Sequence, residues 1–552
     1  MPDKLEPEMS TTDQPNILLI MADQLAAQAL SMYGNRVCKT PNLEKLAADG
    51  LVFDNCYTNF PLCVPARASM LSGRLAANID AFDNACELPA SVPTMAHYLR
   101  SVGYQTILSG KMHFIGPDQV HGFNERLTTD VYPSTFKWIA DWNAGPQFVP
   151  SGTALNGVVE SGPSIRTLQE DFDDEVAYQS VQKIYDLARD PERKPFFLLT
   201  SFTNPHTPFT CSDTYWDRYD SDEIDMPAVP ELAFEDLDYH SKALFFAHGR
   251  HRHRLQEDDL RRARHAYYGM ISYIDDKIGQ LLEALDRTGL RDNTLIIFIS
   301  DHGEMLGERG LWFKQHFWDW SARVPMIFNL PGTVAKGCCE KVVSLVDLLP
   351  TLLDFADPSY DDNCLSQFRL DGRSLTGVFS GNEEGCPDLA ICDYLAIGPC
   401  VPCRMVRKGR YKFYYTHGHP NMLFDMEDDP DELNNVAAQA AFHEVETELL
   451  AICLKNWDPD KLTQTIVESQ AQRKLIAKST GHDQPWNHLV RTDDGSRYVR
   501  EGGVDDTKGR LRLPFVEMVP SDWPALESGT IQDLISGRKK LTDVIPDYRS
   551  LE

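Results

Sequence analysis

The stretch Thr294-Leu295-Ile296-Ile297-Phe298-Ile299-Ser300 runs directly into Asp301-His302-Gly303 and decides how this sequence folds. Nearly all of its residues are β-branched or large and apolar, which is typical of a central strand that is covered on both faces. The run Asn16 to Met21 has the same character and ends in Ala22-Asp23-Gln24. We therefore expect two buried strands that each deliver an acid at the carboxyl end.

Strand and helix patterns alternate around these two runs. Further strands are expected at Leu51 to Tyr57, Tyr104 to Leu108 and Phe196 to Phe202, and helices at Leu43 to Asp49, Pro93 to Ser101, Asp173 to Arg189 and Leu260 to Thr288. This alternation predicts an α/β fold in which helices sandwich a large, mostly parallel sheet. Ligands of such sheets bind beyond the carboxyl ends of the strands. Asp23, Lys111, Asp301 and the segment Asn204 to His206 should therefore meet at one rim.

The pattern changes after residue 386. Shorter strands are expected at Leu389 to Tyr394, Cys403 to Val406 and Tyr411 to Tyr415, followed by a helical tract from Val436 to Leu454. We predict three parts: a disordered N-terminal tail over residues 1–14, a catalytic α/β domain over 15–386, and a smaller α+β domain with a tail over 387–552.

The chain is strongly acidic. Its 552 residues contain 53 Lys and Arg against 82 Asp and Glu, so the formal net charge is -29. A nucleic-acid backbone would be repelled, and we expect no nucleic-acid partner. The main basic cluster, His248 to Arg254, is interpreted as a solvated loop before the long helix. Any site for an anionic substrate needs a local group of cationic side chains and metal.

The thirteen cysteines are an odd number, and no secretory leader is visible in the sequence. The apolar run Ile17 to Ala22 is shorter than a membrane span. These features predict a cytoplasmic protein without a membrane partner, in which most cysteines are buried thiols. Cys400 and Cys403 form a lone Cys-x-x-Cys pair, which we interpret as local packing rather than as a structural zinc site.

The run Cys63-Val64-Pro65-Ala66-Arg67, which continues through Leu71-Ser72-Gly73-Arg74, carries most of the functional information. It places a nucleophilic side chain just before a proline and a helical pattern, where the positive end of a helix attracts anions. Arg67 and Arg74 add fixed positive charge along the same helix.

This pattern resembles the signature of the type I sulfatases of the alkaline phosphatase superfamily. The resemblance implies that Cys63 is oxidised by a formylglycine-generating maturation enzyme to formylglycine, an aldehyde that hydrates to a geminal diol. It also implies the alkaline-phosphatase-like fold and the hydrolysis of a sulfate monoester.

Asp23, Asp301 and His302, together with an oxygen at position 63, would suit a hard divalent cation. Ca²⁺ is the first candidate, and Mn²⁺ and Mg²⁺ are the alternatives. A thiolate is a mismatched ligand for such an ion, which favours a modified Cys63. The same four positions with an unmodified cysteine would instead suit zinc.

The resemblance also implies roles for other residues. Arg67 would anchor the hydrated aldehyde, Lys111 and His113 would flank it, and Lys314 would hold the ester oxygens. His206 would protonate the leaving group. Gln24 stands where many sulfatases carry a second aspartate, and we do not count it as a ligand.

Within the family, the segments Asp83 to Ala85, Ser109 to Phe114 and Gly307 to Lys314 are most similar to the choline sulfatases. This implies a small alkyl sulfate as substrate and Asn84, Trp138 and Asp393 as substrate-binding residues. An aromatic face and a carboxylate attract a trimethylammonium group, although a tryptophan in the core or at an interface explains Trp138 equally well. The segment Pro485 to Arg500 resembles a tail that reaches a neighbouring subunit, which implies a homo-oligomer.

Three departures from that family concern recognition of the alcohol. Asn204 and Thr207 stand on either side of His206 where the family tends to have His and Asp, and the segments Trp142 to Glu170 and Asn487 to Asp494 match poorly. Two other functions stay open. One is a phosphonate monoester or phosphodiester hydrolase on the same fold. The other is an inactive homologue that binds anions and keeps Cys63 as a thiol.

Overall fold

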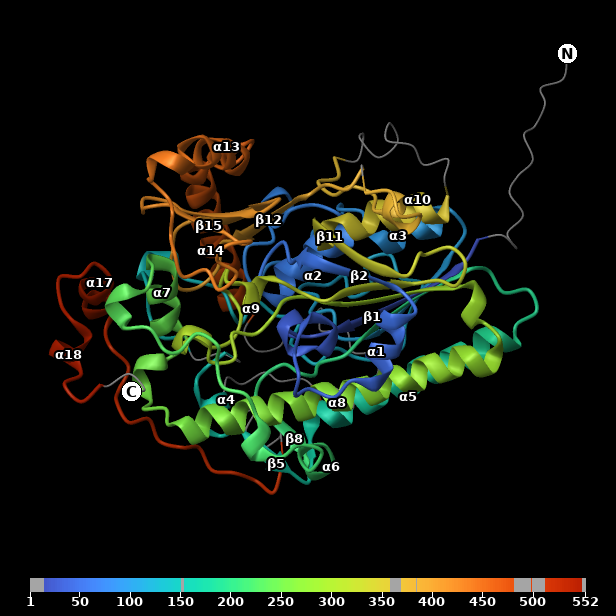
Figure 1. The fold of residues 1–552 in the computed structure, drawn as a ribbon, viewed down its shortest axis with the longest axis horizontal. Helices are drawn as coiled ribbons and strands as arrows, with labels where there is room; N and C mark the ends of the chain where they lie inside the picture. Colours follow the sequence, from blue (N-terminus) through green and yellow to red (C-terminus); the bar gives the residue numbers. More distant parts are fainter. Residues whose placement is uncertain are drawn as a thin grey trace, which may run out of the picture.

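The protein is described by a computed structural model over residues 14–149, 153–357, 369–383, 385–480, 498 and 512–548. Its centre is an 8-stranded sheet (Figure 1). The strands, in spatial order, are β11 (Gly337–Ser344), β2 (Leu51–Tyr57), β10 (Met326–Asn329), β9 (Thr294–Ser300), β1 (Asn16–Ala22), β7 (Phe196–Ser201), β3 (Gln105–Gly110) and β4 (Glu125–Arg126). Only β10 runs antiparallel to its neighbours, so the mostly parallel sheet that the sequence predicts is confirmed.

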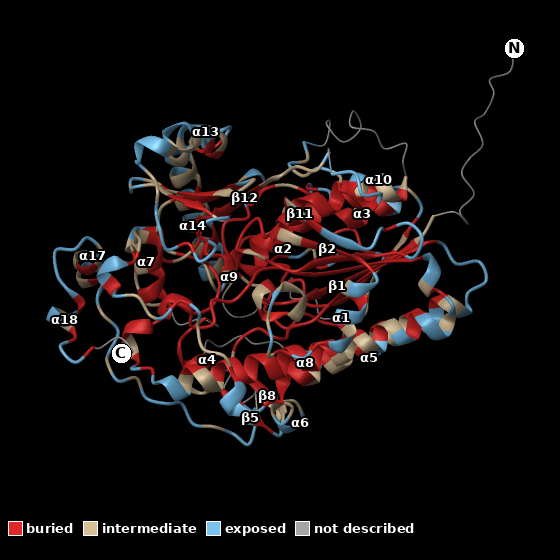
Figure 2. Ribbon diagram, viewed as in Figure 1, coloured by how far each residue is buried: buried red, intermediate tan, exposed pale blue. Residues whose placement is uncertain are grey.

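Helices cover both faces of this sheet. On one face lie α1 (Pro41–Ala48), α5 (Leu168–Arg189) and α8 (Glu257–Thr288); on the other lie α2 (Cys63–Ser72), α3 (Met95–Ser101) and α10 (Leu348–Ala356). Alternate residues of β1 feed the two hydrophobic cores, with Leu18 and Ile20 in one and Ile17 and Leu19 in the other. Figure 2 shows the sheet and the inner sides of these helices as continuously buried. Burial on both faces explains why the strands read as apolar runs.

A second, antiparallel sheet of β12 (Leu389–Tyr394), β13 (Cys403–Lys408), β14 (Tyr411–Thr416) and β15 (Met422–Asp425) follows along the chain. Helix α13 (His443–Leu454) packs on it through Leu449 and Cys453. The smaller C-terminal α+β part is therefore confirmed. A domain boundary at residue 386 stays a prediction.

Short elements and connections complete the described chain. They are α4 (Asn156–Val159), β5 (Gly162–Ser164), β6 (Arg166–Thr167), β8 (Thr210–Ser212), α6 (Asp213–Trp216), α7 (Tyr239–Ala247), α9 (Asp319–Ala322), α12 (Thr376–Phe379), α14 (Pro459–Thr480), β16 (Arg512–Leu513), α17 (Ser528–Ile535) and α18 (Leu541–Val544).

Two helices, α5 and α13, begin more than one helical turn away from the start that the sequence pattern predicts. Helix α5 begins at Leu168 because Thr167 and Glu170 form a capping box, in which each side chain bonds the backbone N–H of the other. Helix α13 begins at His443 rather than at Val436. Asn435 instead accepts hydrogen bonds from the backbone of Leu423 and Ala437, which ties the segment before the helix to β15. The predicted tail over residues 1–14 lies outside the described residues, apart from Gln14.

The interpretation of His248 to Arg254 as a solvated loop is wrong. His248, Arg250, His251 and His253 are buried, and only Arg254 is exposed. Arg250 forms an ion pair with Glu231 at 2.7 Å. Burial lowers the pKa of His251 to about 3 and that of His248 to about 4, so these imidazoles are neutral near pH 7. The basic run is acceptable in the interior because its histidines carry no charge there.

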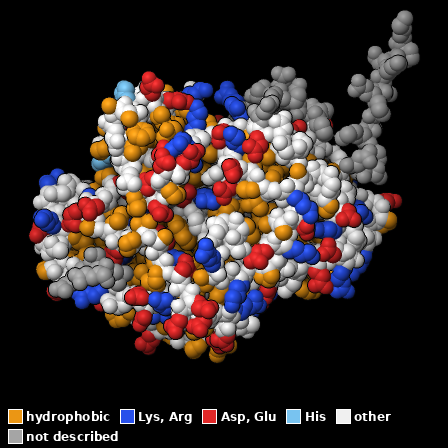
Figure 3. Space-filling view, viewed as in Figure 1, with side chains coloured by type: hydrophobic (Ala, Val, Ile, Leu, Met, Phe, Trp, Pro, Cys, Tyr) orange, Lys and Arg blue, Asp and Glu red, His pale blue; other side chains and the backbone are white. Residues whose placement is uncertain are grey.

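On the face shown in Figure 3, acidic and basic side chains are interspersed rather than gathered into one basic area. None of the helices in the described part of the chain is long and apolar enough to cross a membrane.

Candidate active site and metal centre

The carboxyl ends of β1 and β9 place two acids side by side. Ala22 pairs with Ser300 in the sheet, so Asp23 and Asp301 leave adjacent strands at the same level. Helix α2 begins at Cys63 and is buried over its whole length, which directs its first turn at the same rim. The convergence predicted from distant segments is therefore present in the fold.

Asp23, Cys63, Asp301 and His302 form one buried cluster, and a potential ligand atom of each lies within 4.8 Å of the others. Cys63 Sγ is 3.3 Å from His302 Nε2 and 3.9 Å from Asp23 Oδ1. His302 Nε2 is in turn 3.6 Å from Asp301 Oδ2. All four residues predicted to hold a metal are brought together.

The charge states of this cluster suit a cation. Burial lowers the pKa of His302 to about 3, so its ring is neutral. His302 Nδ1 lies 3.1 Å from the Gly303 carbonyl, and donation there leaves the Nε2 lone pair facing the cluster. Burial alone would raise the pKa of Asp301, but the positive charges of Arg67 and Lys111 outweigh it and hold the pKa below its ordinary value. Two carboxylates and a neutral imidazole fit a divalent ion such as Ca²⁺ or Mn²⁺.

Two cations stand beside the acids. Lys111 forms an ion pair with Asp23, and its Nζ is 3.7 Å from Cys63 Sγ. Arg67 donates from Nε to Asp301 at 2.8 Å and from Nη1 to Ser201 Oγ at 2.9 Å. The guanidinium therefore fixes the orientation of a candidate ligand, and it makes no hydrogen bond with Cys63 itself among the described contacts.

Lys314 and His206 form the opposite side of the site. Lys314 Nζ is 2.6 Å from His206 Nε2. The other ring nitrogen, Nδ1, lies 2.6 Å from the carbonyl oxygen of Thr207 and donates to it. In this tautomer Nε2 accepts a hydrogen bond from the Lys314 ammonium.

Gln24 has structural partners that the sequence did not indicate. Its amide donates to Glu304 and its carbonyl oxygen accepts from Lys314. Burial raises the pKa of Glu304 to about 7. Gln24 therefore links a buried carboxyl group, Glu304, to the Lys314 ammonium.

An aromatic wall lines the open side, and sequence reasoning missed its central member, Tyr132. Its ring stacks on His113 with centroids 4.5 Å apart and meets Trp138 edge-on at 5.4 Å. Its hydroxyl is 3.2 Å from His206 Nε2, and Lys111 Nζ lies 4.3 Å from the ring centroid. Burial and then Lys111 hold the pKa of His113 well below its ordinary value. The sequence feature that could have indicated Tyr132 as a site residue is its aromatic side chain directly after the Thr-Thr-Asp-Val run.

A cavity of about 60 Å³ opens onto these groups. Its lining comprises Leu62, Cys63, Asp83, Asn84, His113, Tyr132, Trp138, Val149, Thr153, His206, Lys314, Gln315, Ala396 and Ile397. Asn84 and Trp138 are thus brought to the site. Asp393 is not among the lining residues, because its carboxylate is buried against the Arg404 guanidinium at 2.7 Å.

Most of the predicted tail, Pro485 to Arg500, lies outside the described residues. Its described member, Tyr498, is buried and contacts the ring of Phe172 in the same chain at 5.5 Å.

Comparison with known proteins identifies the family. The sulfatase family model matches residues 15–358, and a model of the C-terminal part of N-sulphoglucosamine sulphohydrolase matches 307–456. A choline-sulfatase of Rhizobium meliloti is 40% identical over 516 residues, covering 91% of this chain and 99% of that protein. An arylsulfatase of Clostridium perfringens is 30% identical and covers 78% of this chain and 92% of its own.

Solved structures agree with the fold. A phosphonate monoester hydrolase of Agrobacterium radiobacter superposes with a TM-score of 0.62 at 25% identity, over 82% of this chain and 96% of that one. The sequence match and the buried cluster at the carboxyl ends of β1 and β9 lead to the same conclusion. This chain belongs to the sulfatase family and is a sulfuric ester hydrolase.

Proposed function

We propose that this sulfatase hydrolyses choline sulfate, or a related small alkyl sulfate, to the alcohol and inorganic sulfate. The observation that carries this proposal is the match to a choline-sulfatase along almost the whole of both chains. The small cavity beside Cys63, walled by Tyr132 and Trp138, supports a compact substrate with a cationic end.

Position 63 is the proposed nucleophile. Burial raises the pKa of the Cys63 thiol, so an unmodified side chain would be a neutral thiol and a poor nucleophile. Conversion by a formylglycine-generating enzyme would supply a hydrated aldehyde with two hydroxyl groups. One would be available for attack on sulfur, and deprotonation of the other would restore the carbonyl group and break the C–O bond to sulfate. Asp23, which is paired with Lys111 beside this position, would accept the proton of the attacking hydroxyl.

Asp23, Asp301, His302 and the side chain at position 63 would hold the metal, with Ca²⁺ as first candidate and Mn²⁺ or Mg²⁺ as alternatives. Bound there, the ion would supply positive charge that polarises the ester and the attacking oxygen. Arg67 keeps Asp301 in place for this role through its 2.8 Å hydrogen bond.

The residues proposed to bind the ester and to assist departure of the alcohol lie on the side of the site that carries Lys314 and His206. Lys314 would neutralise the non-bridging sulfate oxygens, and His113 would flank the hydrated aldehyde. His206 would protonate the leaving oxygen, drawing its proton from Lys314 at 2.6 Å. Asn84 and Trp138 would contact the alcohol. Asp393 is committed to Arg404, so the aromatic faces rather than this carboxylate would receive the cationic end.

Cell location and oligomeric state are two further proposals. The cysteines that the structure describes are all free thiols, which supports a reducing compartment such as the cytoplasm. A homo-oligomer, suggested by the resemblance of the tail, also remains a proposal.

A phosphonate monoester hydrolase is the second candidate, favoured by the structural likeness to such an enzyme. The decisive experiment compares three substrates with the purified enzyme: choline sulfate, 3,3-dimethylbutyl sulfate, in which an uncharged tert-butyl group replaces the trimethylammonium group, and an aryl phosphonate monoester. We expect kcat/KM to be highest for choline sulfate. Trp138→Ala should remove the preference for choline sulfate over the tert-butyl isostere, which we expect to be about tenfold. A preference for the phosphonate would overturn the proposal in favour of the second candidate.

A further inference from the structure

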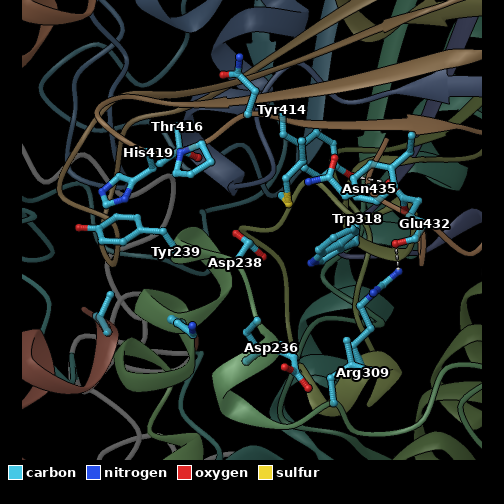
Figure 4. Close-up of a pocket in the computed structure, with 18 of the residues that line it drawn as sticks. Asp236, Asp238, Tyr239, Arg309, Trp318, Tyr414, Thr416, His419, Glu432 and Asn435 are labelled. Carbon is cyan, nitrogen blue, oxygen red and sulfur yellow. Dashed lines mark hydrogen bonds between the residues drawn. The ribbon is translucent and has the colours of Figure 1, made fainter. Parts of the chain in front are cut away.

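A second cavity of about 740 Å³ lies between α7, the loop after β9, the C-terminal sheet and α17 (Figure 4). Its volume is in the range of sites for small organic ligands. It lies outside the catalytic site, with which it shares no lining residue. Nothing in the proposed reaction uses it.

The base of this second cavity carries polar atoms without a partner. Asp238 Oδ2 is buried and accepts no hydrogen bond within the described residues, whereas Asp238 Oδ1 caps α7 by accepting from the Ser241 N–H at 3.1 Å. His240 and His316 line a small recess next to Asp238. The Nε2 atoms of these two buried rings also have no partner among the described groups. Asp238 Oδ2 is an acceptor, and a buried acceptor left unpaired is costly, so this end of the cavity favours a ligand that donates N–H groups.

Aromatic side chains surround this base. Tyr239 stacks on His419 with ring centroids 3.5 Å apart, and Trp318 meets Tyr414 edge-on at 5.3 Å. In Figure 4 the carboxylate of Asp238 points into the space between Tyr239 and Trp318. A carboxylate framed by aromatic rings is a suitable receptor for an ammonium group.

A guanidinium stands on the opposite wall. Arg309 donates to the backbone carbonyls of Asp431 and Glu432, the latter at 2.8 Å, and lies 4.0 Å from the centre of the Trp318 ring. No carboxylate in the described part of the chain forms an ion pair with it. Glu432, the nearby acid, is already paired with Lys412 at 2.8 Å. Arg309 is therefore available to an anionic group of a ligand.

We propose that the second cavity binds a small zwitterion, with an N–H-bearing ammonium on Asp238 and a carboxylate or sulfonate on Arg309. An amino-acid-like compound has this chemistry. The two charged groups and the aromatic frame line one cavity, and the recess with the unpaired ring nitrogens adjoins it at Asp238. The inference does not depend on the identity of the proposed substrate.

The test is calorimetric titration of the purified full-length protein with matched probes. γ-Aminobutyrate and taurine carry both charges and N–H donors, the N-trimethyl analogue of γ-aminobutyrate carries both charges without N–H, and butylamine and butyrate carry one charge each. We expect the two N–H zwitterions to bind at one site per chain. The trimethyl analogue and the single-charge probes should bind about tenfold more weakly.

Variants locate the site. Asp238→Ser keeps a side chain that can cap α7 but removes the carboxylate, and it should weaken γ-aminobutyrate binding about tenfold. Asp220→Ser is the matched control, because Asp220 caps another short helix by accepting from Asp222 N–H. Arg309→Gln, which keeps an amide donor for the backbone carbonyls, should weaken binding as well and serves if Asp238→Ser fails to fold.

Trp138→Ala distinguishes this site from the catalytic cavity, since it should leave zwitterion binding unchanged. Binding that is lost in Trp138→Ala, or that is equal in wild type, Asp238→Ser and Arg309→Gln, would overturn the proposal. So would the absence of binding by any zwitterion, or equal affinity for the trimethyl analogue.

Discussion

Cys63 Sγ lies 3.3 Å from His302 Nε2, and both side chains are almost completely buried. The two residues are far apart in the sequence. They meet because α2 begins at Cys63 and β9 ends at Ser300 on the same rim of the sheet. The residue proposed as nucleophile is therefore part of the candidate metal centre, and metal and nucleophile should act together.

Removal of His302 should abolish metal binding and turnover together. We expect His302→Ala to lower kcat/KM by about 100-fold or more, because the ion would lose a neutral nitrogen ligand. The measurements are metal content by mass spectrometry and turnover of the preferred sulfate ester, with His417→Ala as a control at a partly exposed histidine. A His302→Ala enzyme with a full complement of metal and normal activity would exclude this ligand.

His206 should matter in proportion to the quality of the leaving group. His206→Ala should reduce hydrolysis of an alkyl sulfate by about 100-fold or more, because the alkoxide needs a proton as it departs. The phenolate that leaves an activated aryl sulfate needs less protonation, so the rate of hydrolysis of that substrate should fall much less. Steady-state kinetics on both substrates check this prediction. Equal losses would remove the role of proton donor from His206 and leave it a part of sulfate binding.

Tyr132 should position His206 rather than react. Tyr132→Phe deletes the hydroxyl that lies 3.2 Å from His206 Nε2 but keeps the ring that stacks on His113. We expect kcat for an alkyl sulfate to fall about tenfold with little change in KM. We also expect an apparent pKa in the pH profile of kcat to shift, because the hydroxyl next to the His206 imidazole is lost. An unchanged pH profile would mean that the hydroxyl does not act through His206.

Buried neutral histidines should make the fold sensitive to acid. The pKa of His251 falls from 6.5 to about 3 on burial, so below pH 6.5 the unfolded chain binds a proton that the folded chain does not. Stability from this group is complete above pH 6.5 and is lost as the pH falls toward 3. His251→Leu removes that loss. When the pH falls from 7 to 5, the unfolding free energy of wild type should therefore drop by about 2 kcal/mol more than that of the variant.

Denaturant unfolding at the two pH values measures this difference. His417→Leu, at a partly exposed histidine, is the control and should show little change. A wild type and a His251→Leu variant with parallel pH dependence would show that His251 is not a source of acid lability.

Much of the fold was predictable because buried parallel strands leave a plain signal. Thr294–Ser300 is buried along its whole length, and the bounds of this strand and of Leu51–Tyr57 agree with the sequence pattern. The first residues of helices were harder to predict from the sequence. The first turn of α5 contains Glu170 and Asp171, and it depends on the cap at Thr167 rather than on an apolar period.

Some residues of the candidate site could likewise be predicted from the sequence, and others could not. Asp23, Cys63, Asp301 and His302 could be predicted because each stands at the end of a strand or the start of a helix, where topology fixes its position. Tyr132 lies in an irregular segment without periodicity, and its contacts with His113 and His206 arise only in three dimensions. Asp393 shows the converse limit, because the sequence cannot reveal that its carboxylate is occupied by Arg404.

The central claim is that position 63 acts as an oxygen nucleophile derived from cysteine. Peptide mass spectrometry on the active native enzyme tests it most directly, combined with turnover measured on the same sample. The account predicts formylglycine at position 63 in a fraction of molecules that tracks the specific activity, and no turnover in Cys63→Ala. A fully active enzyme that contains only the unmodified cysteine at this position would contradict it.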